Sequence, residues 1–468
     1  MSHASPVAER LADFTSAFRL HDAPESVSSR MVRHIADTMA CALGGAFDAD
    51  SAAVSSVLEE ARRFAYPAEA TILGVGERIE RRAAAMANAT FARHLDANDI
   101  YLGKPGRFAG GGHFSDVLPA LLSVAEARDA GGRAFLETAI VAYEVQGALA
   151  DAYLWMTQGL HTVSQVSIAA AAGTARLLNL PRTETSHAIA LAISGGMILQ
   201  SWLKPSAQVP TVKSVAAGLA AERGILCAQL ASRGATGALD AIETMVSQWP
   251  ADFIPDAFDF PGQEWRTPQN AIKSAPAQIF TQAVVQCGEQ LFEQGLRLDA
   301  VREITVRSNN GACGRVQGAP EAFRPETREA ADHSTPFVLA MTLRDGSVTL
   351  ASYDRQQWLD PAIRAAMDRM SLIIDPEWDA RFEAGQFGAE VDAVDVYGSR
   401  YRARVDQFVG HPDNPLSDSR LIAKMRGLIE GEARFPADRA DQIFKACLAL
   451  PEAPSLRPLL ESCVPNRT

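Results

Sequence analysis

The chain has 468 residues, of which 47% are hydrophobic and 21% are charged, as is usual for a folded globular protein. A chain of this length can bury a large core without disulfides or structural metal ions, and it predicts roughly two or three domains. The formal net charge of −12 excludes nucleic acid as the expected main partner, because phosphate binding requires a basic surface.

The six cysteines are scattered, and no two of them have the C-x-x-C spacing of a zinc or iron–sulfur site. We therefore expect no metal and no cofactor, and free cysteines of this kind fit a reducing cytosol. The N-terminal stretch has no apolar run of signal-peptide type, and no segment reaches membrane-span length. The sequence thus predicts a cytoplasmic protein that does not bind a membrane.

The first part of the chain predicts helices, because its apolar residues recur at intervals of three and four. In RMVRHIADTMACAL this spacing places Met31, Ile35, Met39 and Leu43 on one helical face. Two later stretches, SQVSIAAAAGTARLL and VKSVAAGLAAERGILCAQLA, are almost wholly small or apolar. A helix that is apolar all round is usually buried within a larger helical body. We expect both stretches to form such helices.

The pattern then changes from helical to mixed. VREITVRS alternates Ile304 and Val306 with charged neighbours, as a half-buried strand does, and GSVTLASY predicts a further strand. VDAVDVYGSRYRARV predicts a hairpin with the turn residues Gly398 and Ser399. Helical patterns such as PAIRAAMDRMSLI lie between these strands.

These patterns divide the chain into three segments. Residues 1–266 are expected to form one large all-α domain, and residues 267–408 a smaller α+β domain. The last segment, residues 409–468, begins with GHPDNPLSDSRLIAKMRGLIE, in which a turn precedes Ser417 or Asp418 as a helix cap. We expect its helices to return to the helical body.

The stretch RHLDANDIYLGKPGRFAGGGHFSD brings several charged residues together with a glycine run. It contains Asp96, Asp99, Lys104, Arg107 and, after three glycines, His113. A carboxylate and an imidazole can move a proton, and cations can hold the carboxylates of a small substrate. The alternative is a solvated loop with an Asx turn at DAND. The glycine run is not a phosphate-binding Walker loop, because the lysine precedes the glycines.

Other isolated polar residues are candidates for the same site. His161 precedes an apolar helix, where it could instead satisfy a helix terminus. Lys213 opens a nearly apolar helix and Lys273 begins the second domain; each must reach water or meet an anion, because burying an unpaired ammonium is costly. In TREAADHSTPF, Asp332 and His333 precede an apolar run, where helix capping is the alternative role. No G-x-S-x-G elbow of a serine hydrolase is present.

Taken in chain order, six stretches resemble the MmgE/PrpD family, and the resemblance covers nearly the whole chain. The stretches are RHLDAND, GGHFSD, AYEVQGAL, TVKSVAAGLAAERGILCAQLASRGATG, TREAADHSTPFVLAMTLRDG and GHPDNPLSD. The resemblance implies a large all-α domain with a smaller α+β lid domain, usually as a homodimer, with the active site between the domains. The family includes a dehydratase of 2-methylcitrate, a decarboxylase of cis-aconitate and an epimerase of iminodisuccinate. All three act on a small polycarboxylate without an iron–sulfur cluster.

The resemblance also implies roles for individual residues. Asp96 and His113 match the family's acid–base positions, and His161 matches a second active-site histidine. Lys213 and Lys273 match two lysines that neutralise substrate carboxylates. The further residues that we expect to bind substrate are Arg93, Asp99, Lys104, Arg107, Lys204, Gln278, Asp332 and His333.

The sequence departs from the family pattern at four positions. The threonine after the Asp-rich motif is Ile100, and the proline after the loop histidine is Phe114. Where the dehydratase branch has P-A-E-x-H, this chain reads PAQIF, with Gln278 and Phe280. The loss of a carboxylate and an imidazole predicts a less polar wall at that side of the site.

Three hypotheses about function follow. The first is a metal-independent dehydratase of a 2-methylcitrate-like tricarboxylate, which the resemblance would place in the methylcitrate cycle of propionate catabolism. The second is a decarboxylase or epimerase of a related acid, which the changed wall motivates. The third is a non-catalytic carboxylate-binding protein. It is the weakest of the three, because the acid–base residues and both lysines are present.

Overall fold

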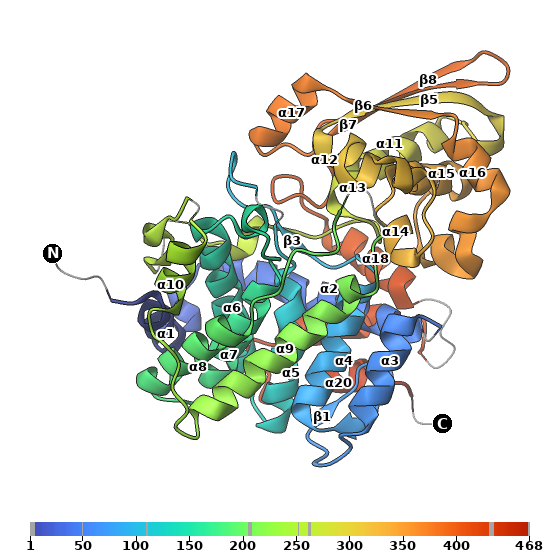
Figure 1. Ribbon diagram of the computed structural model, residues 1–468. Coiled ribbons are helices and arrows are strands. Elements are labelled where there is room, and N and C mark those ends of the chain that lie inside the picture. Colours follow the sequence, from blue (N-terminus) through green and yellow to red (C-terminus); the bar gives the residue numbers. More distant parts are fainter. Residues whose placement is uncertain are drawn as a thin grey trace.

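The molecule consists of a larger helical body and a smaller mixed α+β part, which confirms the predicted fold class (Figure 1). The computed structural model describes residues 5–48, 50–108, 111–204, 208–250, 252–260, 264–429 and 435–466. Within these residues each part has a hydrophobic core of its own. All six cysteines are buried and free.

The first helices of the body follow the predicted spacing of apolar residues. Met31, Ile35, Met39 and Leu43 lie on one face of their helix, and each is 0% exposed. The helices of this part of the chain are α1 (Val7–Ala17), α2 (Glu25–Phe47), α3 (Ala52–Arg62), α4 (Arg81–His94), α5 (Leu118–Ala127), α6 (Gly132–Ala152), α7 (Ser164–Leu177), α8 (Arg182–Gly195), α9 (Val212–Ala231) and α10 (Ala241–Gln248).

Helix α9 lies at the front of the body in Figure 1, and it is less buried than the sequence suggested. The prediction that it is buried on all sides is wrong, because Val212, Leu219, Leu226 and Leu230 are 36–48% exposed. The sequence could not show this, since these residues are as apolar as those of the buried face. Among the described residues, none of the helices has both the length and the apolar character required to cross a membrane.

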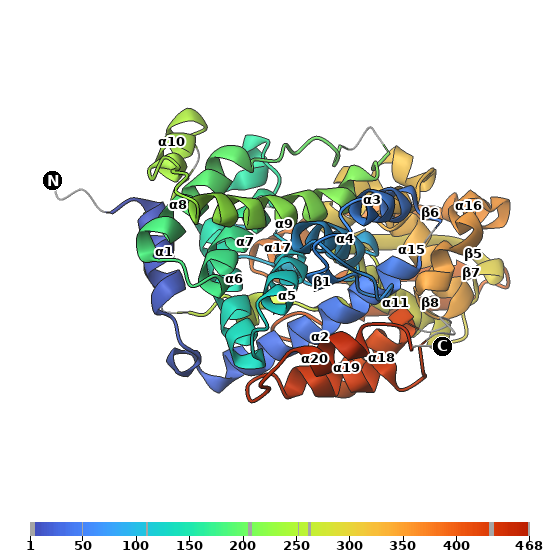
Figure 2. The ribbon, with the colours of Figure 1, turned by 90° about the horizontal axis from the view of Figure 1, so that it is seen from below.

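The C-terminal helices lie in a row along α2, at the lower edge of the view in Figure 2. They are α18 (Asp418–Ile429), α19 (Arg439–Leu448) and α20 (Arg457–Ser462). Leu421 and Met425 of α18 and Ile443 of α19 belong to the same hydrophobic core as α2. The last segment of the chain therefore packs against the helices formed by its first segment.

The α+β part is built on a four-stranded sheet with the order β6-β5-β7-β8. Strands β5 and β6 are parallel, whereas β5–β7 and β7–β8 are antiparallel. The predicted strand VREITVRS is confirmed as β5, with Ile304 and Val306 buried, and the predicted hairpin is confirmed as β7–β8. The strands are β5 (Val301–Ser308), β6 (Met370–Ile374), β7 (Ala389–Asp395) and β8 (Arg400–Val405).

Helix α11 packs on strands β7 and β8, and α15 packs on α11, so that the sheet forms the outer edge of the molecule (Figure 1). The helices of this part are α11 (Gln282–Glu293), α12 (Asn310–Cys313), α13 (Arg315–Gly318), α14 (Arg328–Ala331), α15 (Thr335–Asp345), α16 (Pro361–Met367) and α17 (Pro376–Glu383).

The strand predicted at GSVTLASY is wrong, and the helix predicted at PAIRAAMDRMSLI is only partly right. The first stretch leads into a 3-10 helix, η9 (Leu350–Leu359), in which the backbone N–H of Thr349 donates to Ser352 Oγ at 3.0 Å. Serine and threonine side chains that bond locally to the backbone compete with strand pairing. The second stretch ends its helix at Met367 and continues as strand β6.

A small two-stranded ribbon joins the two parts of the molecule near their boundary. Strand β3 (Ile100–Tyr101) pairs antiparallel with β4 (Asn270–Ala271), with Ile100 opposite Ala271. Tyr101 also forms an isolated β-bridge with the glycine-rich loop, in which its N–H donates to the carbonyl of Gly112 at 2.8 Å. The ribbon thus brings together three segments that carry predicted site residues. The other ribbon of the body pairs β1 (Ala70–Thr71) with β2 (Arg78–Ile79).

Candidate active site

Asp96 lies just beyond the C-terminal end of α4, in an uncommon backbone conformation. Its φ of +52° is in the left-handed region, which costs an ordinary residue roughly 1–2 kcal/mol and which aspartate tolerates better than most. Its side chain is only 1% exposed. A buried carboxylate held in this conformation requires partners that fix both its charge and its backbone.

Three cations surround the Asp96 carboxylate. Lys273 donates to one carboxylate oxygen and, at 2.7 Å, to the backbone carbonyl of Asp96. Lys213 Nζ lies 3.4 Å from Oδ2, and Arg93 Nη1 donates to Oδ1 at 3.2 Å. The side chains of Lys213 and Lys273 are 0% and 1% exposed. The sequence prediction that these lysines meet an anion is therefore fulfilled by Asp96.

Local packing explains why these cations reach one point. Lys273 follows β4 by two residues, and Asp96 precedes β3, so the β3–β4 ribbon brings them together. Lys213 lies in the first turn of α9, which approaches α4 closely at Gly218. A Cβ atom at Gly218 would lie 2.4 Å from the carbonyl oxygen of Met86. Only glycine permits this approach, which places Lys213 at the end of α4.

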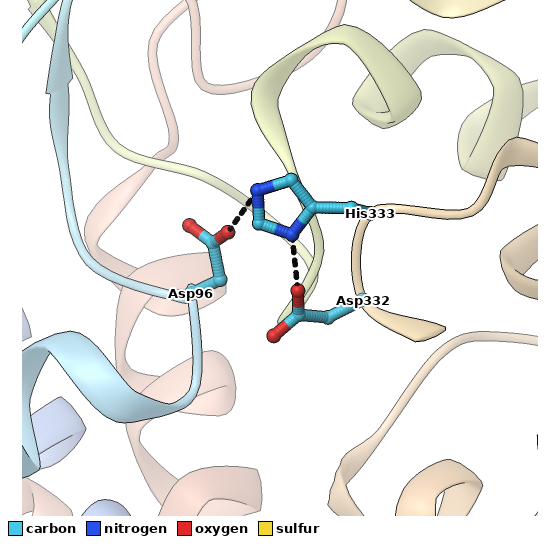
Figure 3. Close-up of side chains that lie close together, drawn as sticks. All are labelled: Asp96, Asp332 and His333. Atoms are coloured by element: carbon cyan, nitrogen blue, oxygen red, sulfur yellow. Dashed lines mark hydrogen bonds and ion pairs between the residues drawn. The ribbon is translucent and has the colours of Figure 1, made fainter. Parts of the chain in front are cut away.

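Asp332 and His333 enter the cluster from the α+β part (Figure 3). His333 Nδ1 lies 2.5 Å from Asp332 Oδ1, and its Nε2 lies 3.7 Å from Asp96 Oδ2. Lys213 Nζ also donates to Asp332 Oδ2 at 3.0 Å. The next residue, Ser334, caps α15 by accepting the N–H of Phe337 at 3.0 Å. The motif thus combines a helix cap with two residues of the cluster.

His113 lies beside the same carboxylate, with Nε2 3.9 Å from Asp96 Oδ1. Its Nδ1 is buried and has no hydrogen-bond partner among the described residues. Burial, together with the charges of Arg93 and Lys273, holds the pKa of His113 well below its usual value. His113 is therefore neutral at pH 7 and can accept a proton.

The charges in the cluster determine which groups are ionised. Burial alone would raise the pKa of Asp96, but the charges of Lys213 and Lys273 outweigh it and hold that pKa well below its usual value. Burial also lowers the pKa of Lys273 to about 8, although the Asp96 carboxylate opposes this shift. Asp96 is thus an anion at neutral pH, and it cannot serve there as a proton donor.

The cations of this cluster are shared between its two central carboxylates and two flanking ones. Arg328 adds a fourth cation, since its Nη1 donates to Asp332 Oδ2 at 3.2 Å and to the carbonyl of His94 at 3.1 Å. Arg328 Nε also lies 3.6 Å from Asp48 Oδ2, and Arg93 Nε lies 3.9 Å from Asp116 Oδ2, so the four cations are shared among four carboxylates. Burial raises the pKa of Asp116 to about 7, so this carboxyl is only partly ionised at neutral pH and does not fully neutralise Arg93. The arrangement suits a small anionic ligand with more than one carboxylate.

A metal ion does not fit the three residues that could otherwise hold one. Donor atoms of Asp96, Asp332 and His333 lie within 4.8 Å of one another. The ammonium group of Lys213, however, already lies 3.0 Å from Asp332 Oδ2 and 3.4 Å from Asp96 Oδ2. A divalent cation among these oxygens would face strong repulsion from both lysines.

Three predicted site residues lie near the cluster but outside its hydrogen bonds. Asp99 is buried in a separate network, in which it accepts the Tyr143 hydroxyl at 2.9 Å. The His161 ring packs against Trp202 at an interplanar angle of 32°, with centroids 4.4 Å apart, and burial lowers its pKa to about 3. The Gln278 side chain turns back to accept the N–H of Phe280. Their proposed contacts with substrate stay predictions.

Three other predicted cations lie farther out. Lys104 and Lys204 are exposed. Arg107 points to the carbonyls of Asp151 and Asp252, each 3.4 Å from Nη2. A substrate-binding role for these three side chains also stays a prediction.

Two of the residues that depart from the family pattern, Ile100 and Phe280, lie in hydrophobic packing. Phe280 packs in an aromatic cluster of the α+β part, with ring centroids 5.5 Å from Phe108 and 6.0 Å from Phe387. Ile100 belongs to the same hydrophobic core and is 3% exposed. Both residues thus contribute to packing between the loop and the α+β part.

The sequence patterns indicated no role for Arg328 or for Gln165. Gln165 lies beside Gly112, and neither its amide nitrogen nor its amide oxygen has a hydrogen-bond partner among the described residues. A buried amide without partners is costly, so this side chain is a candidate contact for a ligand. A lone glutamine in the apolar stretch SQVSIAAAAG was the signal that could have identified it.

Buried cations around a carboxylate, with two histidines beside them, have the chemical groups that acid–base chemistry on a small anion requires. The chain belongs to the MmgE/PrpD family: residues 9–249 match the model of the MmgE/PrpD N-terminal domain, and residues 275–450 match that of the MmgE/PrpD C-terminal domain. The N-terminal match contains Asp96, His113 and Lys213, and the C-terminal match contains Asp332 and His333.

Of three similar curated proteins, two are named 2-methylcitrate dehydratase and one is named cis-aconitate decarboxylase. The chain is 27% identical to the 2-methylcitrate dehydratase of Escherichia coli (strain K12) over 379 residues, which cover 76% of each chain. It is 27% identical to the 2-methylcitrate dehydratase of Salmonella typhimurium over 405 residues, which cover 82% of each chain. It is 26% identical to the cis-aconitate decarboxylase of Homo sapiens over 443 residues, which cover 90% of this chain and 87% of that protein.

The convergence of buried cations predicts that a tricarboxylate stabilises the protein. Citrate at about 100 times its Kd would add about 2.7 kcal/mol to the free energy of unfolding. The stabilisation should decline as the pH rises through about 8, because Lys273 then loses its charge. Thermal unfolding with and without citrate, from pH 6.5 to 9.5, measures both effects.

Two variants provide the controls for this measurement. Lys213→Met should lose most of the citrate-induced shift in Tm, whereas Lys445→Met should keep it, because Lys445 is exposed and lies outside the cluster. A citrate shift that is unchanged in Lys213→Met would contradict the assignment of the cluster as the anion site.

Proposed function

We propose that this protein is a lyase that dehydrates a 2-methylcitrate-like tricarboxylate to its cis-aconitate analogue without a metal ion. The observation that supports this most directly is the buried cluster in which Lys213, Lys273, Arg93 and Arg328 converge around Asp96 and Asp332. Cations gathered at one buried point suit a substrate with two or three carboxylates. The similarity to proteins named 2-methylcitrate dehydratase supports the same substrate class.

The lysines would stabilise the charge that develops during the reaction. Removal of a proton next to a carboxylate moves negative charge onto the carboxylate oxygens, as in an enediolate. Lys213 and Lys273 are held in place by Asp96 before substrate binds, so they need not reorganise in the transition state. Burial strengthens their effect, because water does not screen the charges.

The two histidines would divide the proton transfers between them. Neutral His113 takes the proton from carbon. The electron pair of the broken carbon–hydrogen bond forms the double bond as the carbon–oxygen bond breaks. His333, whose Nδ1–H is held by Asp332, donates its Nε2 proton to the departing hydroxyl, which leaves as water. Exchange with solvent then returns a proton to His333 and removes one from His113.

A decarboxylase is the second candidate. The chain is similar along nearly its whole length to a protein named cis-aconitate decarboxylase, and its site lacks the hydroxyl expected at Ile100. On the same cluster, loss of carbon dioxide would leave a carbanion that a protonated histidine neutralises. The products distinguish the two reactions, because only the decarboxylase releases carbon dioxide.

The test is turnover by chelator-treated protein with 2-methylcitrate, citrate or cis-aconitate in separate assays. We expect 2-methylcitrate to give a rise in ultraviolet absorbance from the conjugated alkene. His113→Gln and His333→Gln should each lower kcat by about 100-fold or more. His21→Gln should not change it, since His21 has a side chain that is 83% exposed and lies outside the cluster.

Other outcomes would contradict the proposal in different ways. Carbon dioxide release from cis-aconitate without turnover of 2-methylcitrate would replace the dehydratase by the decarboxylase. Full activity of both histidine variants would contradict the roles given to these residues. No turnover of any of the three acids by the folded protein would contradict the proposed substrate class.

We further propose that the protein forms a homodimer through α9. Val212, Leu219, Leu226 and Leu230 are spaced by seven, seven and four residues, which places them on one face of the helix. All four are 36–48% exposed, although a surface helix normally turns polar residues outward. A second copy of the same helix, related by twofold symmetry, would cover this stripe.

Charged substitutions in the stripe test the dimer. Leu219→Asp combined with Leu226→Asp should give a monomer in sedimentation velocity, because two buried carboxylates would face their copies across the interface. Leu359→Asp, at a leucine of the α+β part that is 40% exposed, is the matched control and should leave the dimer intact. A wild-type protein that sediments as a monomer would contradict the proposal.

A further inference from the structure

Lysine is rare in this chain, and its few positions fall into two groups. Only six of the 44 lysines and arginines are lysines. Lys104, Lys204 and Lys445 are exposed. The other three have side chains that are at most 6% exposed; they are Lys213, Lys273 and Lys424. Two of these three belong to the cluster around Asp96, which directs attention to Lys424.

Lys424 reaches the same loop from the C-terminal helix α18. Its Nζ donates to Asp37 Oδ1 at 2.5 Å and to the backbone carbonyl of Ala97 at 2.7 Å. Ala97 is the residue after Asp96. Lys273 donates to the carbonyl of Asp96 itself, also at 2.7 Å. Two consecutive peptide carbonyls are therefore each bound by a buried ammonium group.

These contacts fix the backbone at Asp96 and Ala97, where the conformation requires support from other segments. Helix α4 ends at His94, and the carbonyls beyond a helix end have no partners within the helix. Asp96 also holds a left-handed φ, which persists only where the surroundings impose it. Lys273 and Lys424 bind this segment from two different parts of the chain. A compact ammonium fits between a carboxylate and a carbonyl, where a planar guanidinium would require more room.

Lys424 does not belong to the cluster itself. Among the described residues, its hydrogen bonds and ion pairs are those with Asp37 and Ala97. Asp37, on α2, is 1% exposed and balances the charge of Lys424. Burial raises the pKa of Asp37 to about 6, and Lys424 opposes that shift. The pair is thus a separate buried unit behind the loop.

We propose that Lys424 is a positioning residue for the active site. By holding the carbonyl of Ala97, it fixes the backbone that directs the Asp96 carboxylate between Lys213 and Lys273. The C-terminal helix α18 then contributes to the geometry of the active site. The kinetic consequences rest on the proposed lyase function, whereas the structural consequence does not.

The experiment removes the carbonyl contact without leaving an unpaired buried charge. Lys424→Met alone would strand the Asp37 carboxylate, so it is combined with Asp37→Asn, and Asp37→Asn alone is the first control. The single variant keeps the bond from Lys424 to Ala97. Lys445→Met, at an exposed lysine of α19, controls for loss of a lysine.

We expect the double variant to lower kcat by about 10- to 100-fold relative to Asp37→Asn, because a small displacement of Asp96 disturbs the reacting geometry. Its KM should change by less than about threefold, since Lys213 and Lys273 still bind the substrate carboxylates. Lys445→Met should match the wild type in both constants. Thermal unfolding and circular dichroism establish that each variant is folded.

A crystal structure of the double variant is the second measurement. We expect Asp96 to leave its left-handed conformation, with its carboxylate more than 1 Å from its wild-type position beside Lys213. Asp96 unmoved, with kcat equal to that of Asp37→Asn, would overturn the proposal. If the wild type shows no lyase activity, the proposed function fails, and the position of Asp96 in this crystal structure still decides the role of Lys424.

Discussion

The Asp96 carboxylate, buried between the ammonium groups of Lys213 and Lys273, is the interaction on which the rest of the site depends. Each of these charges would be costly in the interior alone, and the two lysines belong to segments far from Asp96 in the sequence. Their convergence requires the close approach of α9 to α4 at Gly218 and the pairing of β3 with β4. The fold therefore assembles this charged cluster from its own residues, without a ligand.

The same arrangement links the two parts of the molecule. The helical body provides Asp96, His113 and Lys213, and the α+β part provides Asp332 and His333. The cluster is largely shielded from solvent, since its carboxylates are at most 1% exposed and the side chain of His113 is 9% exposed. Such shielding limits the access of water to proton transfers at the cluster.

The sequence predicted which residues belong to the cluster better than it predicted where the side chains of the loop point. His113, Lys213 and Lys273 were identifiable as isolated polar residues, whereas Asp96 was identifiable as a carboxylate on the charged stretch that leads to the glycine run. Lys104 and Arg107 belong to the same loop, yet adjacency in a loop does not determine which way a side chain points. The fold class and the β5 strand followed from periodicity, whereas GSVTLASY failed because local serine and threonine bonds replaced strand pairing. The role of Lys424 was missed because its contact with the Asp96 loop is to a backbone carbonyl, which no side-chain pattern encodes.

The most direct test of the account is a crystal structure of the protein with citrate bound. We predict that the citrate carboxylates lie within hydrogen-bond distance of Lys213 Nζ and Lys273 Nζ, with His113 beside the carbon chain. Citrate bound elsewhere on the molecule, with the cluster unchanged, would contradict the claim that the buried cations around Asp96 form the substrate site.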